Sequence, residues 1–134
     1  MSAEPVNPKA IPGRRKPQIA TMPLGTLFEV GAVFANGAEK YGIKNWRDDR
    51  IQMSDYLNAI FRHFQAISEG EDIDPIAPKD PAASPGSGKR HLAHIAATCL
   101  IVMDAMDHGT LIDDRWKPKP DLSDVALEYG PGRI

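Results

Sequence analysis

The sequence predicts an all-α helical bundle with an extended arm at each end. Three observations predict it: apolar residues recur at three- and four-residue spacing in three long segments, no segment alternates as a strand does, and most prolines lie outside these segments. At 134 residues the chain can bury one core without disulfides or metal ions. We therefore expect one helical domain over 24–112, between arms over 1–23 and 113–134.

Charge and cysteine content restrict the partners and the compartment. The formal net charge is -2 and the pI is about 6.1, so no global cationic field favours nucleic acid or an anionic membrane. The one cysteine, Cys99, lies in an apolar run typical of a small buried hydrophobe. No segment resembles a membrane span or a signal peptide. We expect a cytoplasmic protein, in the host cytoplasm if a phage encodes it.

The N-terminal arm over 1–23 is rich in proline and carries one basic group. Its prolines and basic residues are Pro5, Pro8, Pro12, Pro17, Pro23, Arg14, Arg15 and Lys16. This composition predicts neither a helix nor a central strand. A solvated tail is the simplest interpretation, and contact of the basic group with a ligand or a neighbouring subunit is the alternative.

Three helices are expected between the arms. The first covers about 24–40 and ends before Gly42, and the second begins after Ser54 as N-cap. Its expected buried stripe is Leu57, Ile60, Phe61, Phe64 and Ile67. The third covers about 89–108 and is apolar around most of its circumference, which predicts a central position in the core. Residues 69–88 form a loop that begins acidic and ends as a Pro, Ala, Ser and Gly surface insertion.

Carboxylates and imidazoles supply the first half of a candidate site. Four carboxylates lie within six residues at the end of the second helix: Glu69, Glu71, Asp72 and Asp74. His91 and His94 are three positions apart on the third helix and project from the same side. Such donors suit Mg²⁺ or Mn²⁺, and the imidazoles shift the preference toward Mn²⁺ or Zn²⁺. A solvated helix end and hydrogen-bonded core histidines are the structural alternatives.

The stretch "GAEKYGIKNWR" at 37–47 supplies the second half. Lys40, Arg47 and, on the next helix, Arg62 are candidates for phosphate oxygens. Trp46 or Tyr41 suits stacking on a base, and Asn45 suits hydrogen bonds to base or sugar. Together with the carboxylates and histidines, these side chains predict a nucleoside triphosphate site, although a tryptophan such as Trp46 packs in the core about as often.

These segments resemble a known family in order and spacing. "GAEKYGIKNWR", "YLNAIFRH" followed by "GEDID", and "SGKRHLAHIAATCLIV" resemble the phage dATP/dGTP diphosphohydrolase domain over roughly 22–108. That domain is similar to the MazG and HisE group of all-α nucleotide pyrophosphohydrolases and includes the MazZ proteins of phages that use 2-aminoadenine. The resemblance implies a MazG-like bundle that cleaves a purine deoxynucleoside triphosphate, dGTP above all and dATP as the second choice, to the monophosphate and pyrophosphate. In the MazZ setting the dGMP supplies 2-aminoadenine nucleotide synthesis.

Site roles follow from this resemblance as expectations. The expected metal ligands for Mg²⁺ or Mn²⁺ are Glu71, Asp74, His63, His94 and Glu39, with Glu29 as a further candidate. Glu71, Asp74 and His94 are the expected catalytic residues. The expected substrate-binding residues are Lys40, Asn45, Trp46, Arg47, Arg62 and His91. The chain departs from the MazG pattern, because Glu71 and Asp74 form its one well-placed acidic pair and the following helix offers histidines.

Other functions stay open at this point. The alternatives are a nucleotide-binding or phage interaction module without turnover, and a phosphohydrolase with an HD-type metal site, which no adjacent His-Asp pair in the expected helices supports. A small three-helix bundle leaves apolar surface uncovered, so we expect a homo-oligomer, a dimer or a tetramer.

Overall fold

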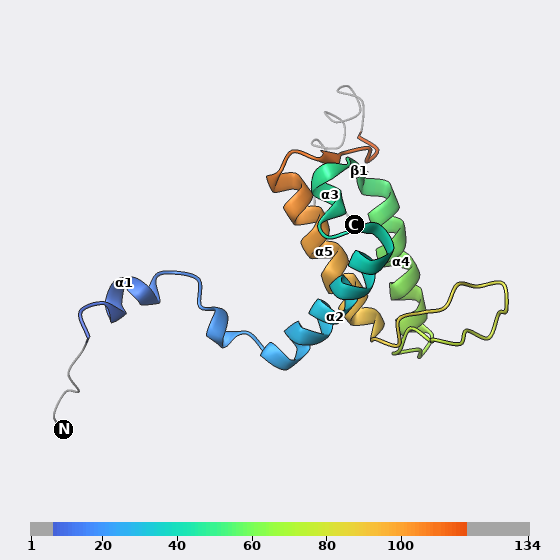
Figure 1. Cartoon of the computed structure of the whole chain (residues 1–134), viewed down its shortest axis with the longest axis horizontal. Helices are drawn as coiled ribbons and strands as arrows, with labels where there is room; N and C mark the ends of the chain where they lie inside the picture. The colour runs from blue at the N-terminus through green and yellow to red at the C-terminus, as the bar shows by residue number, and fades with distance from the viewer. Residues whose placement is uncertain (1–6, 118–134) are drawn as a thin grey trace, which may run out of the picture.

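A computed structural model describes residues 7–117 and confirms the all-α class. Three long helices form the body: α2 (Leu24–Tyr41), α4 (Met53–Ser68) and α5 (His91–Asp107). A short helix α3 (Asn45–Asp48) lies between α2 and α4 (Figure 1). The sequence showed no strand pattern, yet β1 (Ile51–Gln52) and β2 (Leu111–Ile112) pair in parallel. Two residues are too few for alternation to be detected.

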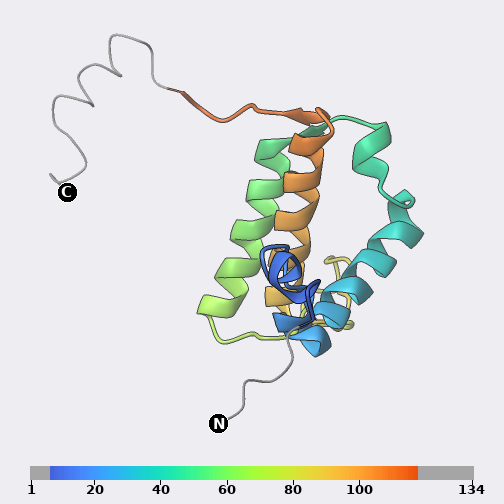
Figure 2. The same ribbon diagram turned by 90° about the vertical axis from the view of Figure 1, so that its left-hand side faces the viewer.

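Helix α5 is the centre of the bundle, as its apolar sequence predicted. It runs antiparallel to α4 on one side and packs against α2 on another (Figures 1 and 2). The core cluster at one end of the bundle consists of Trp46, Ile51 and Ala105, with Phe34, Tyr56, Ile101 and Leu111 packed against it. Small residues on α5 allow the neighbouring helices to approach closely.

Two ion-paired contacts fasten elements from the first half of the chain to α5. At its start, Arg90 donates from Nε to Glu29 Oε2 at 2.9 Å, and its backbone N–H reaches Glu29 Oε1 at 3.1 Å. These hydrogen bonds lower the pKa of Glu29 to about 2. Near its end, Asp104 accepts hydrogen bonds from Trp46 and Arg47. Glu29, a candidate metal ligand from sequence, is therefore engaged in helix packing.

The arms differ from expectation in two places. The N-terminal arm contains α1 (Ala10–Arg14) and a 3₁₀ turn, η1 (Ile19–Thr21), where no helix was expected. Pro12 fits because it lies in the first turn, where a backbone N–H has no intrahelical acceptor. The C-terminal arm begins attached to the body, since Asp114 accepts hydrogen bonds from the Ser54 backbone N–H, at 2.8 Å, and from the Ser54 hydroxyl.

Ser54 is consequently not the N-cap of α4. The helix begins at Met53, two residues earlier than expected, and Gln52 occupies the cap position without a side-chain hydrogen bond. Asp114 supplies from outside the helix the acceptor that the sequence assigned to Ser54. A partner sixty residues away leaves no local signal in the sequence.

Several apolar side chains that were expected in the core are exposed. Phe61 and Phe64 of α4 are 65% and 60% exposed, and Cys99 of α5 is exposed too. The expected stripe of α4 is therefore only partly covered within this chain. None of the helices that the structure describes is long and apolar enough to cross a membrane.

Candidate functional site

A groove lies between α2 and the α4–α5 pair. It consists of three adjoining hollows, and Tyr41 of α2 and His94 of α5 line all three. The wide end measures about 720 Å³ and the lysine end, beside Lys40, about 180 Å³. An inner slot of about 180 Å³ is lined by aromatic side chains and by Asn45. Together they have the size of a small-molecule site.

Three histidines meet where α4 faces the start of α5. The rings of His63 and His94 stack with centroids 4.6 Å apart and planes inclined by 12°. His91 is buried behind them, with its ring centroid 5.1 Å from that of His63. The His-x-x-His spacing on α5 thus places one imidazole on the groove and one in the interior.

Hydrogen bonds connect Glu71 to His63 through His91. A carboxylate only accepts, so His91 donates its Nε2–H to Glu71 Oε1 at 2.8 Å. In neutral His91 the Nδ1 atom then carries a lone pair and accepts from Nδ1–H of His63, 2.8 Å away. Neutral His63 keeps its free lone pair on Nε2, and this residue lines the wide end. Glu71 and His91 therefore fix the tautomer of His63.

Burial keeps the two groove histidines uncharged. It lowers the pKa of His63, and the neighbouring His94 and His91 lower it further. Burial also lowers the pKa of His94, against the opposing effect of Asp74. Since an ordinary histidine titrates near 6.5, both imidazoles are neutral proton acceptors at pH 7.

Asp74 is held by the segment that leads into α5. Its carboxylate accepts the Ser87 backbone N–H at 2.9 Å and lies 3.4 Å from His94 Nε2, which also meets Ser87 Oγ at 2.6 Å. A Cβ on Gly86 would come within 2.5 Å of Asp74 Oδ1, so glycine is required there. The latter part of the expected surface insertion thus shapes the lysine end.

The candidate substrate residues of 37–47 separate into two groups. Lys40 and Asn45 line the groove, as expected. Trp46 is buried, lines the inner slot, and donates from Nε1 to Asp104 at 2.7 Å. Arg47 holds the same carboxylate through Nε and Nη2 at 2.8 and 2.9 Å. Its guanidinium serves an intramolecular ion pair, and phosphate binding by Arg47 stays a prediction.

The other candidates lie around the groove rather than in it. Arg62 is exposed on α4 and Glu39 is exposed on α2, and neither belongs to the described lining. His91 is shielded by His63 and reaches the groove only through that ring. Glu71 is half-exposed on the far side of His91.

The expected metal centre is not assembled as a cage. Across residues 7–117, no group of three or more His, Cys, Asp or Glu side chains is placed to hold a metal ion. Instead, His91 hydrogen-bonds to Glu71, and His94 Nε2 lies 3.4 Å from Asp74 Oδ2. Mg²⁺ commonly binds through one or two carboxylates together with substrate phosphates. Asp74 is the carboxylate that lines the lysine end of the groove.

Some groove residues were missed from sequence. Arg50, Asp55 and Tyr56 line the wide end, and Ser87 lines the lysine end. The sequence offered no spacing pattern that points to Arg50 or Asp55. Tyr56 lies seven positions before His63 on α4, and this helical spacing was the one available signal.

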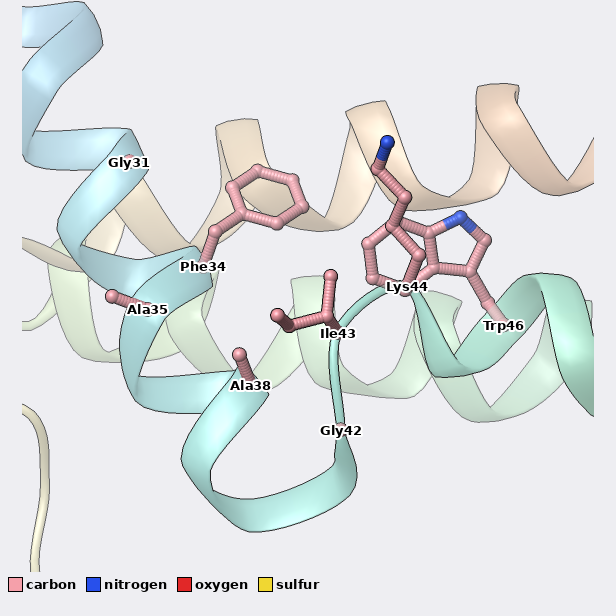
Figure 3. Close-up of a pocket in the computed structure, with 8 residues that line it drawn as sticks. All are labelled: Gly31, Phe34, Ala35, Ala38, Gly42, Ile43, Lys44 and Trp46. Atoms are coloured by element: carbon pink, nitrogen blue, oxygen red, sulfur yellow. The ribbon is translucent and has the colours of Figure 1, made fainter.

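A second cavity of about 550 Å³ lies between the end of α2 and the loop that follows (Figure 3). Gly31, Ala35 and Ala38 form one wall, and Phe34, Ile43, Lys44 and Trp46 complete it. Lys44 is the one titratable group of this lining. The cavity therefore lacks the acid–base groups that the groove gathers.

The fold and the groove define an all-α protein with an imidazole–carboxylate cluster beside a nucleotide-sized site. Residues 6–115 match the model of the family described as dATP/dGTP diphosphohydrolase, N-terminal. The chain belongs to this family, which supports a nucleotide diphosphohydrolase acting on dATP or dGTP. Comparisons with curated proteins and with solved structures give no match.

Proposed function

We propose that the groove hydrolyses a purine deoxynucleoside triphosphate to the monophosphate and pyrophosphate. The observation that carries this proposal is the order of groups along the groove. Lys40 lies at one end, the neutral His94 and His63 lie next to it, and a wide aromatic and polar hollow lies at the other end. A triphosphate with its base in the wide end brings its α-phosphorus beside the histidines and its terminal phosphates beside Lys40.

The chemistry assigned to the chain is a hydrolytic displacement. Water attacks the α-phosphorus, the bond to the bridging oxygen breaks, and pyrophosphate leaves with that oxygen. The Nε2 atom of His63 accepts a proton from the water, since Glu71 and His91 keep that nitrogen unprotonated. Lys40 and Asn36 bind the leaving pyrophosphate at the lysine end.

Metal dependence is part of the proposal. A bound Mg²⁺ or Mn²⁺ would neutralise phosphate charge, and Asp74 would hold it together with the nucleotide. Following the family resemblance, we further propose dGTP as the preferred substrate in the cytoplasm of a phage host, with dGMP supplying 2-aminoadenine nucleotide synthesis.

The decisive experiment identifies products. The purified chain is incubated with each common nucleoside and deoxynucleoside triphosphate in Mg²⁺, Mn²⁺ or EDTA, and the products are separated by anion-exchange chromatography. We expect pyrophosphate and a purine deoxynucleoside monophosphate, with metal. Orthophosphate or tripolyphosphate would assign a different cleavage, and nucleotide binding without turnover under every metal would favour the non-catalytic module.

We also propose that the chain forms a homo-oligomer through α4 and α5. At 100° per residue, Phe64 lies about 100° around α4 from His63 and Phe61 about 160°. Leu92 and Met103 lie about 100° and 120° around α5 from His91. Because the helices are antiparallel, Phe61 and Phe64 fall on the same side as Leu92 and Met103. Light scattering after size exclusion should show a dimer or tetramer. Phe64→Glu should dissociate it and Ile43→Glu, in an exposed loop, should not; an unchanged assembly in Phe64→Glu would exclude this face.

A further inference from the structure

The wide end of the groove combines a cation, an anion and two aromatic rings. Arg50 and Asp55 line it together with Tyr41 and Tyr56. Burial raises the pKa of Tyr56, and the nearby Asp55 and Tyr41 raise it further. Tyr41 is 70% exposed, so most of its surface is available to a ligand.

The charges of Arg50 and Asp55 are available to a ligand. Both side chains are exposed. None of the ion pairs found within residues 7–117 engages Arg50 or Asp55. Two opposite charges in one hollow without an ion pair between them can each bind a different edge of the same ligand.

Guanine matches such a pair on two edges. Its N7 and O6 atoms accept hydrogen bonds and suit a bidentate arginine. Its N1–H and N2–H₂ groups donate, and a carboxylate with two acceptor oxygens suits them. Adenine has an amino donor in place of O6 and an N1 acceptor in place of N1–H. The arginine donors would then face the donating amino group, and the carboxylate would face the accepting N1 atom.

We propose that the wide end is a guanine-selective base pocket in which Arg50 and Asp55 are specificity-determining residues. Arg50 binds the N7 and O6 edge, Asp55 binds the N1 and N2 edge, and Tyr41 stacks on the ring. This assignment rests on the proposed function for its substrate, and it names the residues that would select dGTP over dATP.

The test compares kcat/KM for dGTP and dATP in the wild type, Asp55→Asn, Arg50→Gln and a matched control, Asp49→Asn. Asp49 is an exposed carboxylate next to Arg50 and lies outside the described groove lining. We expect the wild type to prefer dGTP. Asp55→Asn should reduce the dGTP-to-dATP ratio roughly tenfold to a hundredfold, the range for one bidentate base contact. Asp49→Asn should leave the ratio unchanged.

Base analogues test each edge separately. Removing N7 in 7-deaza-dGTP should penalise the wild type but not Arg50→Gln, and removing the N2 amino group in dITP should penalise the wild type but not Asp55→Asn. A wild type that prefers dATP, or a ratio that neither variant changes, would overturn the assignment while leaving hydrolysis intact.

A binding measurement separates this inference from the proposed catalysis. Calorimetric titration with dGMP and dAMP needs no turnover. Tighter binding of dGMP that weakens in Asp55→Asn supports the base pocket even if no triphosphate is hydrolysed. Equal affinity for the two monophosphates, or no binding of either, would overturn it. Circular dichroism of each variant checks that the helices are retained.

Discussion

The segment between Lys40 and Asp55 contributes to two regions, and each region has an aromatic residue, an arginine and an aspartate. In the first, which we call the latch, Trp46 and Arg47 bind Asp104 of α5. In the second, the wide end of the groove, Tyr41, Arg50 and Asp55 line a hollow without forming an ion pair among the described residues. An aromatic ring, an arginine and a carboxylate therefore stabilise the fold in one place and form a ligand site in the other. The difference is whether the charges are paired.

In the latch, the Trp46 N–H, the Arg47 guanidinium and the Asp104 carboxylate all take part in hydrogen bonds. Asp104 accepts from Trp46 Nε1 at 2.7 Å and from Arg47 Nε and Nη2 at 2.8 and 2.9 Å. Hydrogen bonds from Arg47 and Trp46 hold the pKa of Asp104 well below its usual range. Trp46 and Arg47 are both bound to Asp104, so the latch fixes the position of α3, from which Asn45 lines the groove.

The largest expected effect lies on the groove side of this comparison. His63→Gln removes the proposed proton acceptor, and we expect kcat to fall by roughly 10²–10⁴-fold, the usual contribution of general base catalysis. His108→Gln is the control for the effect on kcat of losing a histidine, because His108 is the exposed C-cap of α5, contacts Asp104, and lies outside the described groove lining. The measurement is steady-state hydrolysis with the thermal midpoint Tm recorded in parallel. A His63→Gln enzyme with unaltered kcat would remove His63 from the chemistry.

An intermediate effect is expected in the latch. Asp104→Ala leaves the part-buried Trp46 N–H and the Arg47 guanidinium without their acceptor, which destabilises the fold. We expect Tm to fall by several degrees and KM to rise more than kcat falls, since Asp104 acts on the groove only by positioning α3. Asp107→Ala, one turn further along α5 and exposed, is the matched control. If Asp104→Ala abolished kcat at unchanged Tm, the latch would belong to the catalytic site.

Sequence patterns predicted the helices well because periodicity is local. The first helix was expected over 24–40 and is observed at Leu24–Tyr41, and the third was expected over 89–108 and is observed at His91–Asp107. The start of α4 was misplaced by two residues because its partner is Asp114, far along the chain. Local spacing carries no information on such a contact.

The sequence identified many residues of the candidate site but not the contacts that each of them makes. The sequence identified His63, His91, His94, Glu71 and Asp74, and the structure brings all five to one end of the α4–α5 pair. It did not show that His91 lies behind His63, or that Arg47 is paired with Asp104. Those outcomes depend on which helix faces which, a tertiary property. Arg50 and Asp55 were missed for the same reason, since their common hollow is formed by folding.

The smallest expected effect concerns the second contact on α5, between Glu29 and Arg90, and it depends on pH. The pKa of Glu29 falls from 4.5 to about 2, mainly through hydrogen bonds from Arg90. A carboxyl whose pKa is lowered by folding contributes stability that is complete above its unfolded value and is lost as pH falls toward its folded value. The Glu29 contribution should therefore be full above pH 4.5, and should disappear as the pH falls toward about 2.

Thermal unfolding of wild type and Glu29→Gln between pH 2 and pH 7 measures this contribution. We expect Glu29→Gln to lower Tm slightly above pH 4.5, because Arg90 is partly exposed and such pairs stabilise weakly. The two curves should converge toward pH 2. Glu39→Gln controls for the loss of a carboxylate from the same helix, since Glu39 is exposed and lies outside the ion pairs found within residues 7–117. A Tm difference that stays constant from pH 7 to pH 2 would mean that Glu29 acts through packing, so that only the latch, and not both contacts, would stabilise the bundle through charge pairing.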